Sequence, residues 1–103
     1  MDLSFSVYKM TGAFPPCELY GLSSQMRRAA VSMASNIAEG AGRGSDAEFS
    51  HFLDIARGSS FELETQLIIA SQLEYLDKEK TEIMKNEIVE IQKMITGLKQ
   101  TLK

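Results

Sequence analysis

Apolar residues recur along most of the chain at a helical spacing. Between Gly21 and about Ala41 they are three or four positions apart, which places them on one face of a helix. The same spacing continues from Asp46 to about Tyr75, and a strict heptad seam follows Asp77, whose side chain suits an N-cap. The expected core faces are Leu22, Met26, Ala29, Met33 and Ile37, then Phe49, Phe52, Leu53, Ala56, Ser60, Leu63, Leu67 and Ala70, and finally Met84, Ile88, Ile91, Ile95, Leu98 and Leu102.

A shorter helix is predicted ahead of these three, within residues 2–13. Phe14-Pro15-Pro16 ends it, because proline cannot continue a helix and restricts the residue before it. No segment shows strand alternation bounded by hairpin turns. The sequence therefore predicts an all-α fold, an antiparallel up-and-down four-helix bundle with a short or truncated first helix, in which residues 1–103 form a single domain.

Three glycines alternate with other residues between the second and third predicted helices, in the stretch 40–44. Gly40, Gly42 or Gly44 can adopt the left-handed conformation that closes a helix. Ser45 and Glu48 then match the S-x-x-E capping box that opens the next helix. The common phosphate-loop motifs are not present. We interpret the stretch as a corner between helices, and the alternative is an anion site that uses the neighbouring arginine and the free amides of the next helix.

A polar stripe runs along the second predicted helix beside its core face, and consists of Gln25, Arg28, Ser32, Asn36 and Glu39. Arg28 and Glu39 are too far apart to pair within one helix, so each needs a partner such as Glu62 or Glu64, or a neighbouring subunit. One interpretation is a structural hydrogen-bond network that fixes register, formed by Gln25, Ser32, Asn36, Glu39 and Glu62. The other is a ligand or RNA surface.

The placement of charge adds a candidate nucleic-acid surface. The chain has a formal net charge of -3, which argues against a generally basic nucleic-acid binder. Phosphate contacts would fall to Arg27, Arg28 and Arg43, with Arg57 on the next helix. Because these arginines are few and no aromatic residues interleave with them, one copy is expected to bind weakly, and several copies together more strongly.

Catalytic, metal and membrane chemistry is not indicated. Glu48-Phe49-Ser50-His51 matches the Glu-x-x-His motif of di-iron bundles, but the chain has one histidine. Cys17 lies in a proline-containing loop with no basic cluster to lower its pKa, so it is interpreted as an ordinary thiol. No apolar run is long enough for a membrane-spanning helix, and no secretory signal is evident. We predict a non-enzymatic, cytoplasmic protein without a metal, a cofactor or a small-molecule substrate.

Two long stretches carry a family resemblance, YGLSSQMRRAAVSMASNIAEGAGR and EFSHFLDIARGSSFELETQLIIASQLEYL. They resemble the small four-helix-bundle proteins encoded by intervening sequences in bacterial large-subunit ribosomal RNA genes, and the resemblance covers almost the whole chain. The matching residues are Leu22, Gln25, Arg27, Arg28, Ala29, Ser32, Asn36, Ile37, Ala38, Glu39, Gly40 and Arg43, followed by Phe49, Phe52, Leu53, Ala56, Gly58, Ser59, Glu62, Leu63, Glu64 and Leu67.

The resemblance implies an architecture more than a reaction. The resemblance implies that members of the family assemble as cyclic homopentamers. We therefore expect this chain to form a homo-oligomer, and specifically a pentamer. A related branch, the accessory variability protein of diversity-generating retroelements, binds RNA and its reverse transcriptase. We therefore expect a self-assembling bundle that binds structured RNA or a nucleic-acid enzyme. The alternative is an oligomeric protein–protein interaction module with no nucleic-acid role.

Two departures from the family pattern affect these expectations. Family members usually have a longer first helix with a tryptophan near its start, whereas this chain has no tryptophan and residues 3–11 look like only the final part of that helix. Ala34 stands where many relatives carry proline, so the second helix is expected to be straighter.

Overall fold

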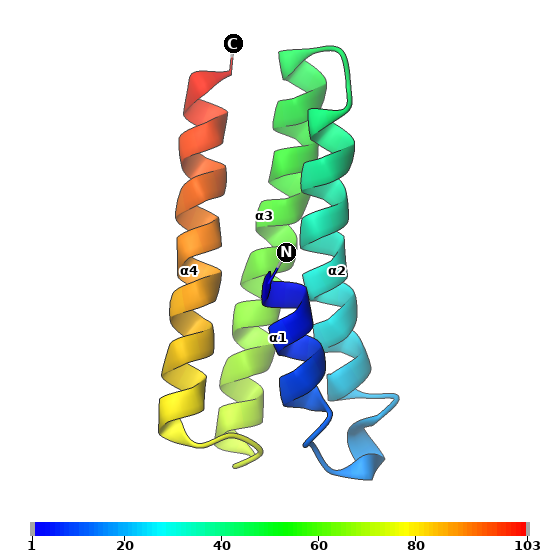
Figure 1. Ribbon diagram of the computed structural model, residues 1–103, viewed down its shortest axis with the longest axis vertical. Helices are drawn as coiled ribbons and strands as arrows, with labels where there is room; N and C mark the ends of the chain where they lie inside the picture. Colours follow the sequence, from blue (N-terminus) through cyan, green and yellow to red (C-terminus); the bar gives the residue numbers. More distant parts are fainter. Residues whose placement is uncertain (1, 103) are drawn as a thin grey trace.

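The computed structural model describes residues 2–102 and has four α-helices in this part of the chain (Figure 1). Successive helices run antiparallel, and the described residues contain no strand. The predicted all-α bundle with a short first helix is confirmed. Its elements are α1 (Asp2–Thr11), the 3-10 turn η1 (Pro16–Glu18), α2 (Leu22–Ala41), α3 (Asp46–Gln72) and α4 (Lys78–Thr101).

Side-chain caps start the two longest helices. Ser45 Oγ accepts a hydrogen bond from the backbone N–H of Glu48 at 3.1 Å, which is the first half of the predicted capping box. Asp77 Oδ1 accepts from the backbone N–H of Lys80 at 2.8 Å, as its N-cap position predicts. Both caps satisfy amides that no residue within the helix can reach.

Helix α2 starts by a different device, because Gly21 at its N-cap has no side chain to offer. Instead Glu18 Oε1, from η1, accepts from the backbone N–H of Leu22 at 3.1 Å. The other oxygen, Glu18 Oε2, accepts from the hydroxyl of Tyr75 at 2.7 Å, and the Tyr75 ring packs 5.2 Å from that of Phe14. The unpredicted turn η1 therefore ties the start of α2 to the loop between α3 and α4.

The corner between α2 and α3 has a different geometry from the one predicted. No glycine within residues 2–102 has a positive φ, so the expected left-handed glycine was wrong; α2 closes at Gly42 with φ -82° and ψ -7°. Gly40 is needed for packing instead. A Cβ atom there would lie 2.7 Å from Cβ of Phe52 and 3.0 Å from a ring carbon of Phe49. Glycine thus lets α2 approach α3 closely at the corner.

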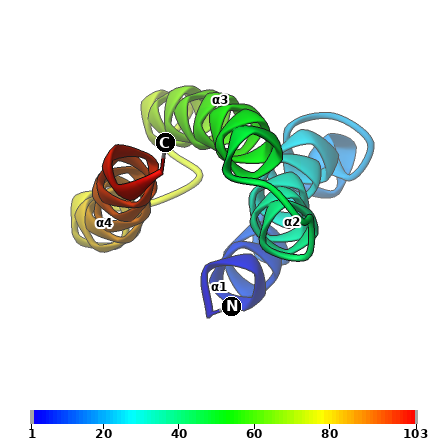
Figure 2. The same cartoon turned by 90° about the horizontal axis from the view of Figure 1, so that it is seen from above.

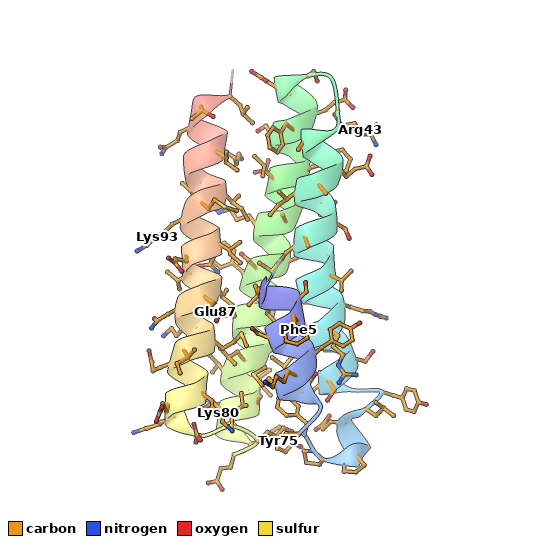
Figure 3. All side chains as sticks on the ribbon, viewed as in Figure 1. Phe5, Arg43, Tyr75, Lys80, Glu87 and Lys93 are labelled. Atoms are coloured by element: carbon orange, nitrogen blue, oxygen red, sulfur yellow. The ribbon has the colours of Figure 1, made fainter. Side chains whose placement is uncertain are left out.

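Each helix packs against the next, and α1 and α4 border the open side of the bundle (Figure 2). A groove of about 770 Å³ separates these two helices, with Tyr75, Lys80 and Glu87 in its lining (Figure 3). Helix α1 is short and lies beside only the half of α2 that includes its start (Figure 1). The bundle consequently has a four-helix end and a three-helix end.

The two ends have separate cores. At the four-helix end the buried apolar residues are Leu3, Val7, Phe14, Met26, Ala29, Ala30, Met33, Leu63, Leu67, Ala70, Met84 and Ile88. At the three-helix end Leu53, Ala56 and Ile95 are buried, and the apolar residues packed against them remain partly exposed, namely Ile37, Phe49, Ile91, Leu98 and Leu102. The predicted core faces of α2, α3 and α4 are therefore correct, but α1 closes only one end over them.

Candidate nucleic-acid interface

The predicted phosphate-binding arginines lie on separate parts of the surface. Arg27 and Arg28 are in the first third of α2, Arg43 is in the corner after it, and Arg57 is on α3. From Arg27 to Arg43 the distance along the helix axis is on the order of 20 Å. One copy of the chain therefore does not gather these side chains into a single basic patch.

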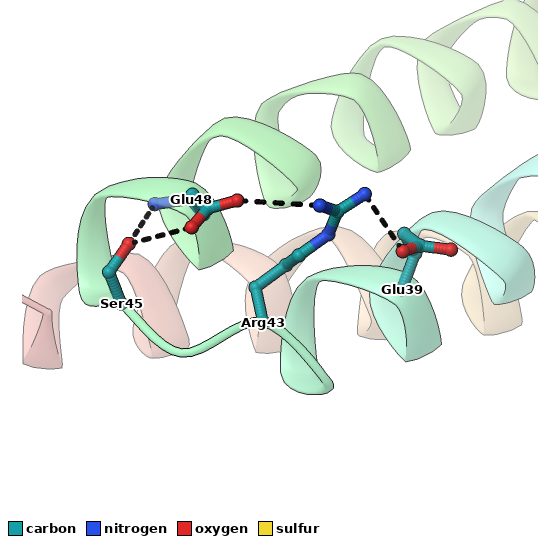
Figure 4. Close-up of polar contacts among 4 residues, drawn as sticks. All are labelled: Glu39, Arg43, Ser45 and Glu48. Carbon is teal, nitrogen blue, oxygen red and sulfur yellow. Dashed lines mark hydrogen bonds and ion pairs between the residues drawn. The ribbon is translucent and has the colours of Figure 1, made fainter.

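Arg43 is held by two carboxylates (Figure 4). Its Nη2 lies 3.0 Å from Glu39 Oε2 and its Nη1 lies 3.5 Å from Glu48 Oε2, while its guanidinium carbon lies 5.0 Å from the centre of the Phe52 ring. Exposed ion pairs of this kind stabilise little. They nevertheless occupy the donors that an anion would need. The alternative of an anion site at the corner therefore loses support, because an anion would have to displace both carboxylates.

Arg27 fastens α1 to α2. Its Nε donates to Oγ1 of the buried Thr11 at 2.7 Å, and its Nη2 donates to the carbonyl oxygen of Tyr8 at 3.4 Å. The guanidinium carbon also lies 4.8 Å from the centre of the Tyr8 ring, within the range of a cation–π contact. Arg27 is thus a structural residue at least in part, which the sequence alone did not indicate.

Arg28 is the free cation of the pair. Within the described chain no hydrogen bond or ion pair engages its side chain, and neither Glu62 nor Glu64 meets it. It lines a groove of about 740 Å³, the α1–α2 groove, whose lining also includes Tyr8, Tyr20 and Arg27. The Tyr20 side chain is 91% exposed. None of the described residues in this lining carries a carboxylate.

The α1–α2 groove places aromatic residues beside the arginines, which the sequence did not predict. In the sequence no aromatic residue stands among the arginines, but the fold brings Tyr8 from α1 and Tyr20 from the segment after η1 to Arg27 and Arg28. The groove is completed by Leu19, Ser24, Val31 and Ser32. Arginine beside exposed aromatic rings is the combination that single-stranded nucleic acid binds.

Arg57 lies in a second groove, between α3 and α4. Its guanidinium carbon is 5.7 Å from the centre of the Phe61 ring. This α3–α4 groove has a volume of about 440 Å³ and is lined by Arg57, Phe61, Val89, Gln92, Lys93, Thr96, Gly97 and Gln100. Arg57 therefore belongs to a different surface from Arg27 and Arg28.

Part of the proposed polar network is present between α2 and α3. The hydroxyl oxygens of Ser32 and Ser59 are 2.9 Å apart, and Asn36 Nδ2 donates to the carbonyl oxygen of Ser32 at 2.8 Å and to its Oγ at 3.1 Å. Ser59 was not assigned to the network from the sequence, since it lies 27 positions after Ser32. The contact between Ser32 and Ser59 links α2 to α3, and the Asn36 hydrogen bonds hold Ser32 from within α2.

The other residues assigned to that network have different surroundings. Glu39 pairs with Arg43, four residues further along the chain in the corner after α2. Gln25 and Glu62 are exposed, and no hydrogen bond or ion pair joins either side chain to another of the residues 2–102. Glu64 accepts a hydrogen bond from Gln92 of α4 at 3.0 Å. Within the polar stripe, Ser32 and Asn36 are thus hydrogen-bonded to each other, and Ser32 also to α3, whereas the side chain of Gln25 at the start of the stripe is not hydrogen-bonded to any of the residues 2–102.

No group of three or more metal-binding side chains forms within residues 2–102. Cys17 is exposed within η1, whereas His51 lies near the start of α3, at the opposite end of the bundle, with its ring edge-on to Phe52. The two are therefore not neighbours. None of the described helices is both long enough and apolar enough to cross a membrane.

Comparison with known proteins places this bundle in a family. Residues 1–97 match the family model of the 23S rRNA-intervening sequence proteins, and the chain belongs to that family. No curated protein matches it. A crystal structure from Bacteroides thetaiotaomicron, of a protein with unknown function from the S23 ribosomal protein family, is similar, with 26% identity and a TM-score of 0.85. The similarity covers 95% of this chain and 92% of that one. The resemblance found in the sequence is thereby confirmed.

Proposed function

We propose that the protein is a non-enzymatic, self-assembling helical bundle that binds structured RNA through the α1–α2 groove. The observation that carries the proposal is the meeting of Arg27 and Arg28 with Tyr8 and Tyr20 in a groove to which no described residue contributes a carboxylate. An exposed tyrosine ring offers a stacking surface to an unpaired base, worth about 1–3 kcal/mol for each base. Arg28, which has no partner among residues 2–102, is the candidate phosphate contact.

Self-assembly places several RNA-binding grooves in one particle, whereas a single copy has one. Two arginines neutralise few phosphates, so a single α1–α2 groove binds weakly, and repetition of the groove in an oligomer raises the overall affinity. The apolar residues left partly exposed at the three-helix end give the association a hydrophobic driving force. Met94 is 44% exposed and follows Glu87, which lines the groove between α1 and α4, by one heptad, so we expect it to extend this surface along the open side of α4. The pentameric state implied by the family remains part of this proposal.

Binding to a hairpin RNA with an unpaired loop, followed by fluorescence anisotropy over a range of salt concentrations, tests the RNA role. Arg28→Gln with Tyr20→Ala should weaken binding by at least about tenfold and reduce the slope of log affinity against log salt by about 0.7 to 1. Arg43→Gln is the matched control, because it removes the same charge from an arginine already paired with carboxylates. Equal losses in both variants, or no binding by the parent at low salt, would reject the RNA role.

The second candidate is an interaction module with no nucleic-acid role. It is favoured by the net charge of -3 and by the neutralised Arg43. Light scattering separates assembly from RNA binding. The parent should be an oligomer, and Met94→Lys should shift it towards the monomer while helix content is retained. Oligomerisation without any retention of RNA would favour this second candidate, and a well-folded monomer at all concentrations would contradict both.

A further inference from the structure

Gly58 and Gly97 stand in the interiors of α3 and α4, where the chain itself has no need of glycine. Both are exposed, neither has a positive φ, and a Cβ atom at either position would meet nothing within 4 Å. Glycine within a helix is destabilising by roughly 0.5–1 kcal/mol relative to alanine. A glycine that lowers helix stability and meets no packing need within the chain indicates contact with another molecule.

The two glycines lie at the same level of the bundle. Asp54 of α3 forms an ion pair with Lys99 of α4, and Glu64 of α3 accepts from Gln92 of α4. Gly58 lies between the two α3 residues, and Gly97 lies between their α4 partners. Because the helices are antiparallel, these two cross-links bracket both glycines within about a turn of each other.

The α3–α4 groove runs past this level, and Gly97 lines it whereas Gly58 lies outside its lining. Phe61, 48% exposed, and Val89 give it an apolar floor. Arg57 and Lys93 flank it with positive charge, and Lys93 extends into solvent (Figure 3). Among the described residues that line the groove there is no carboxylate, and the nearby Asp54 and Glu64 are engaged by Lys99 and Gln92.

We propose that the α3–α4 groove binds an amphipathic helix of a partner protein, with its apolar stripe over Gly97 and its carboxylates against Arg57 and Lys93. Absent side chains let two helix backbones approach closely, which is the use that exposed helical glycines have in packing. From Val89 to Gln100 the groove follows α4 for on the order of 17 Å, about three helical turns.

The positive charge of the groove fits carboxylates, and its geometry favours a helix over RNA. Binding of phosphates needs no gap at backbone level, and Phe61 is the one aromatic ring among the described residues of this lining, whereas the α1–α2 groove has two rings for base stacking. The surface is separate from the α1–α2 groove and shares none of its lining residues. Its test is consequently independent of the RNA proposal.

A labelled helical peptide of about 18 residues, with an alanine and leucine stripe flanked by glutamates, is the probe, and fluorescence anisotropy is the measurement. The full chain should bind it. Gly97→Gln should weaken binding by at least about tenfold, equivalent to about 1.4 kcal/mol. Glutamine is a good helix former and a side chain at position 97 has open space, so thermal stability should not fall. Ala38→Gln, at an exposed position of α2, is the matched control and should leave binding unchanged.

Arg57→Gln with Lys93→Gln should also weaken the peptide and reduce the dependence of its binding on salt. Three results would overturn the proposal. The first is equal binding of a peptide in which lysines replace the glutamates. The second is equally effective displacement of the peptide by a single-stranded RNA of the same charge, which would make the groove a general anion site. The third is loss of the oligomer on the Gly97→Gln substitution, which would assign the groove to a second copy of this chain.

Discussion

The four-helix end and the three-helix end of the bundle use the same sequence pattern and reach different burial. Along the single heptad seam of α4, Met84 and Ile88 are both buried at the four-helix end. At the three-helix end Ile95 is completely buried, but Leu98 and Leu102 are partly exposed. The pattern along α4 is equally regular at both ends, so the difference arises from α1, which packs beside α2 at the four-helix end only. A heptad seam thus identifies the apolar face of a helix, but it does not show how many neighbouring helices cover that face.

The largest expected contrast is between truncations of the two cores. Leu67→Ala, at the four-helix end, removes a completely buried side chain and should destabilise the fold by about 3 kcal/mol. Leu98→Ala, at the three-helix end, should cost about 1 kcal/mol, because Leu98 is partly solvated already. Urea unfolding at low protein concentration measures both. Equal losses would mean that a neighbouring copy covers the three-helix end under those conditions.

Removal of the Arg27 anchor should loosen α1. Arg27→Met keeps much of the packing volume but removes the hydrogen bond to Thr11 and the contact with the Tyr8 ring, so we expect a loss of about 1–2 kcal/mol. Hydrogen exchange should show faster exchange of α1 amides while the amides of α3 are unchanged. Unchanged protection of α1 would show that its apolar face alone, with Leu3 and Val7, holds the helix.

Most of the fold was predictable because its signals are local and repeated. Periodicity located α2, α3 and α4, and the caps at Ser45 and Asp77 fixed two boundaries within a residue. The turn η1 was missed, since three residues are too few to show a period. The left-handed glycine expected at the end of α2 was wrong: Gly42 closes that helix with a negative φ, and the left-handed residue of the described chain is Glu74, with φ 64°, which follows α3.

The candidate interface was predictable only for its arginines. The sequence identified Arg27 and Arg28 as candidate phosphate contacts. That Tyr20 lies in the same groove depends on the path of the chain through η1, which the sequence did not predict. Likewise Ser32 was noted for its polar stripe, and its partner Ser59 becomes evident only once α2 and α3 are paired. Contacts between distant segments follow from packing, which a single sequence does not show residue by residue.

Glu74 offers a smaller effect, in the direction of greater stability. A residue with a side chain in the left-handed region is strained by roughly 1 kcal/mol relative to glycine. Glu74→Gly should therefore raise the free energy of unfolding by up to about 1 kcal/mol. Glu74→Ala, which removes the same carboxylate and keeps the Cβ atom, is the control and should give no gain. A rise in both variants would assign the effect to the charge of Glu74 and not to its backbone.

The smallest effect concerns the pH dependence of the link between η1 and the α3–α4 loop. The hydrogen bond from Tyr75, followed by that from the Leu22 amide, lowers the pKa of Glu18 below its usual 4.5. The same hydrogen bond, with some desolvation, raises the pKa of Tyr75 from 10.0 to about 12. The Glu18 contribution to stability is thus complete above about 4.5 and is lost as the pH falls through the lowered pKa. The Tyr75 contribution is complete below 10.0 and is lost as the pH rises towards 12.

Tyr75→Phe should remove the hydrogen bond and keep the ring contact with Phe14. The difference in unfolding free energy between parent and variant should therefore be greatest at intermediate pH and shrink at both extremes. Absorbance of the ionised phenol adds a direct readout, because the variant should lack the tyrosine that titrates near pH 12. A constant difference between parent and variant at every pH would mean that the ring packs in the loop without the Glu18 hydrogen bond, and that η1 holds the start of α2 unaided.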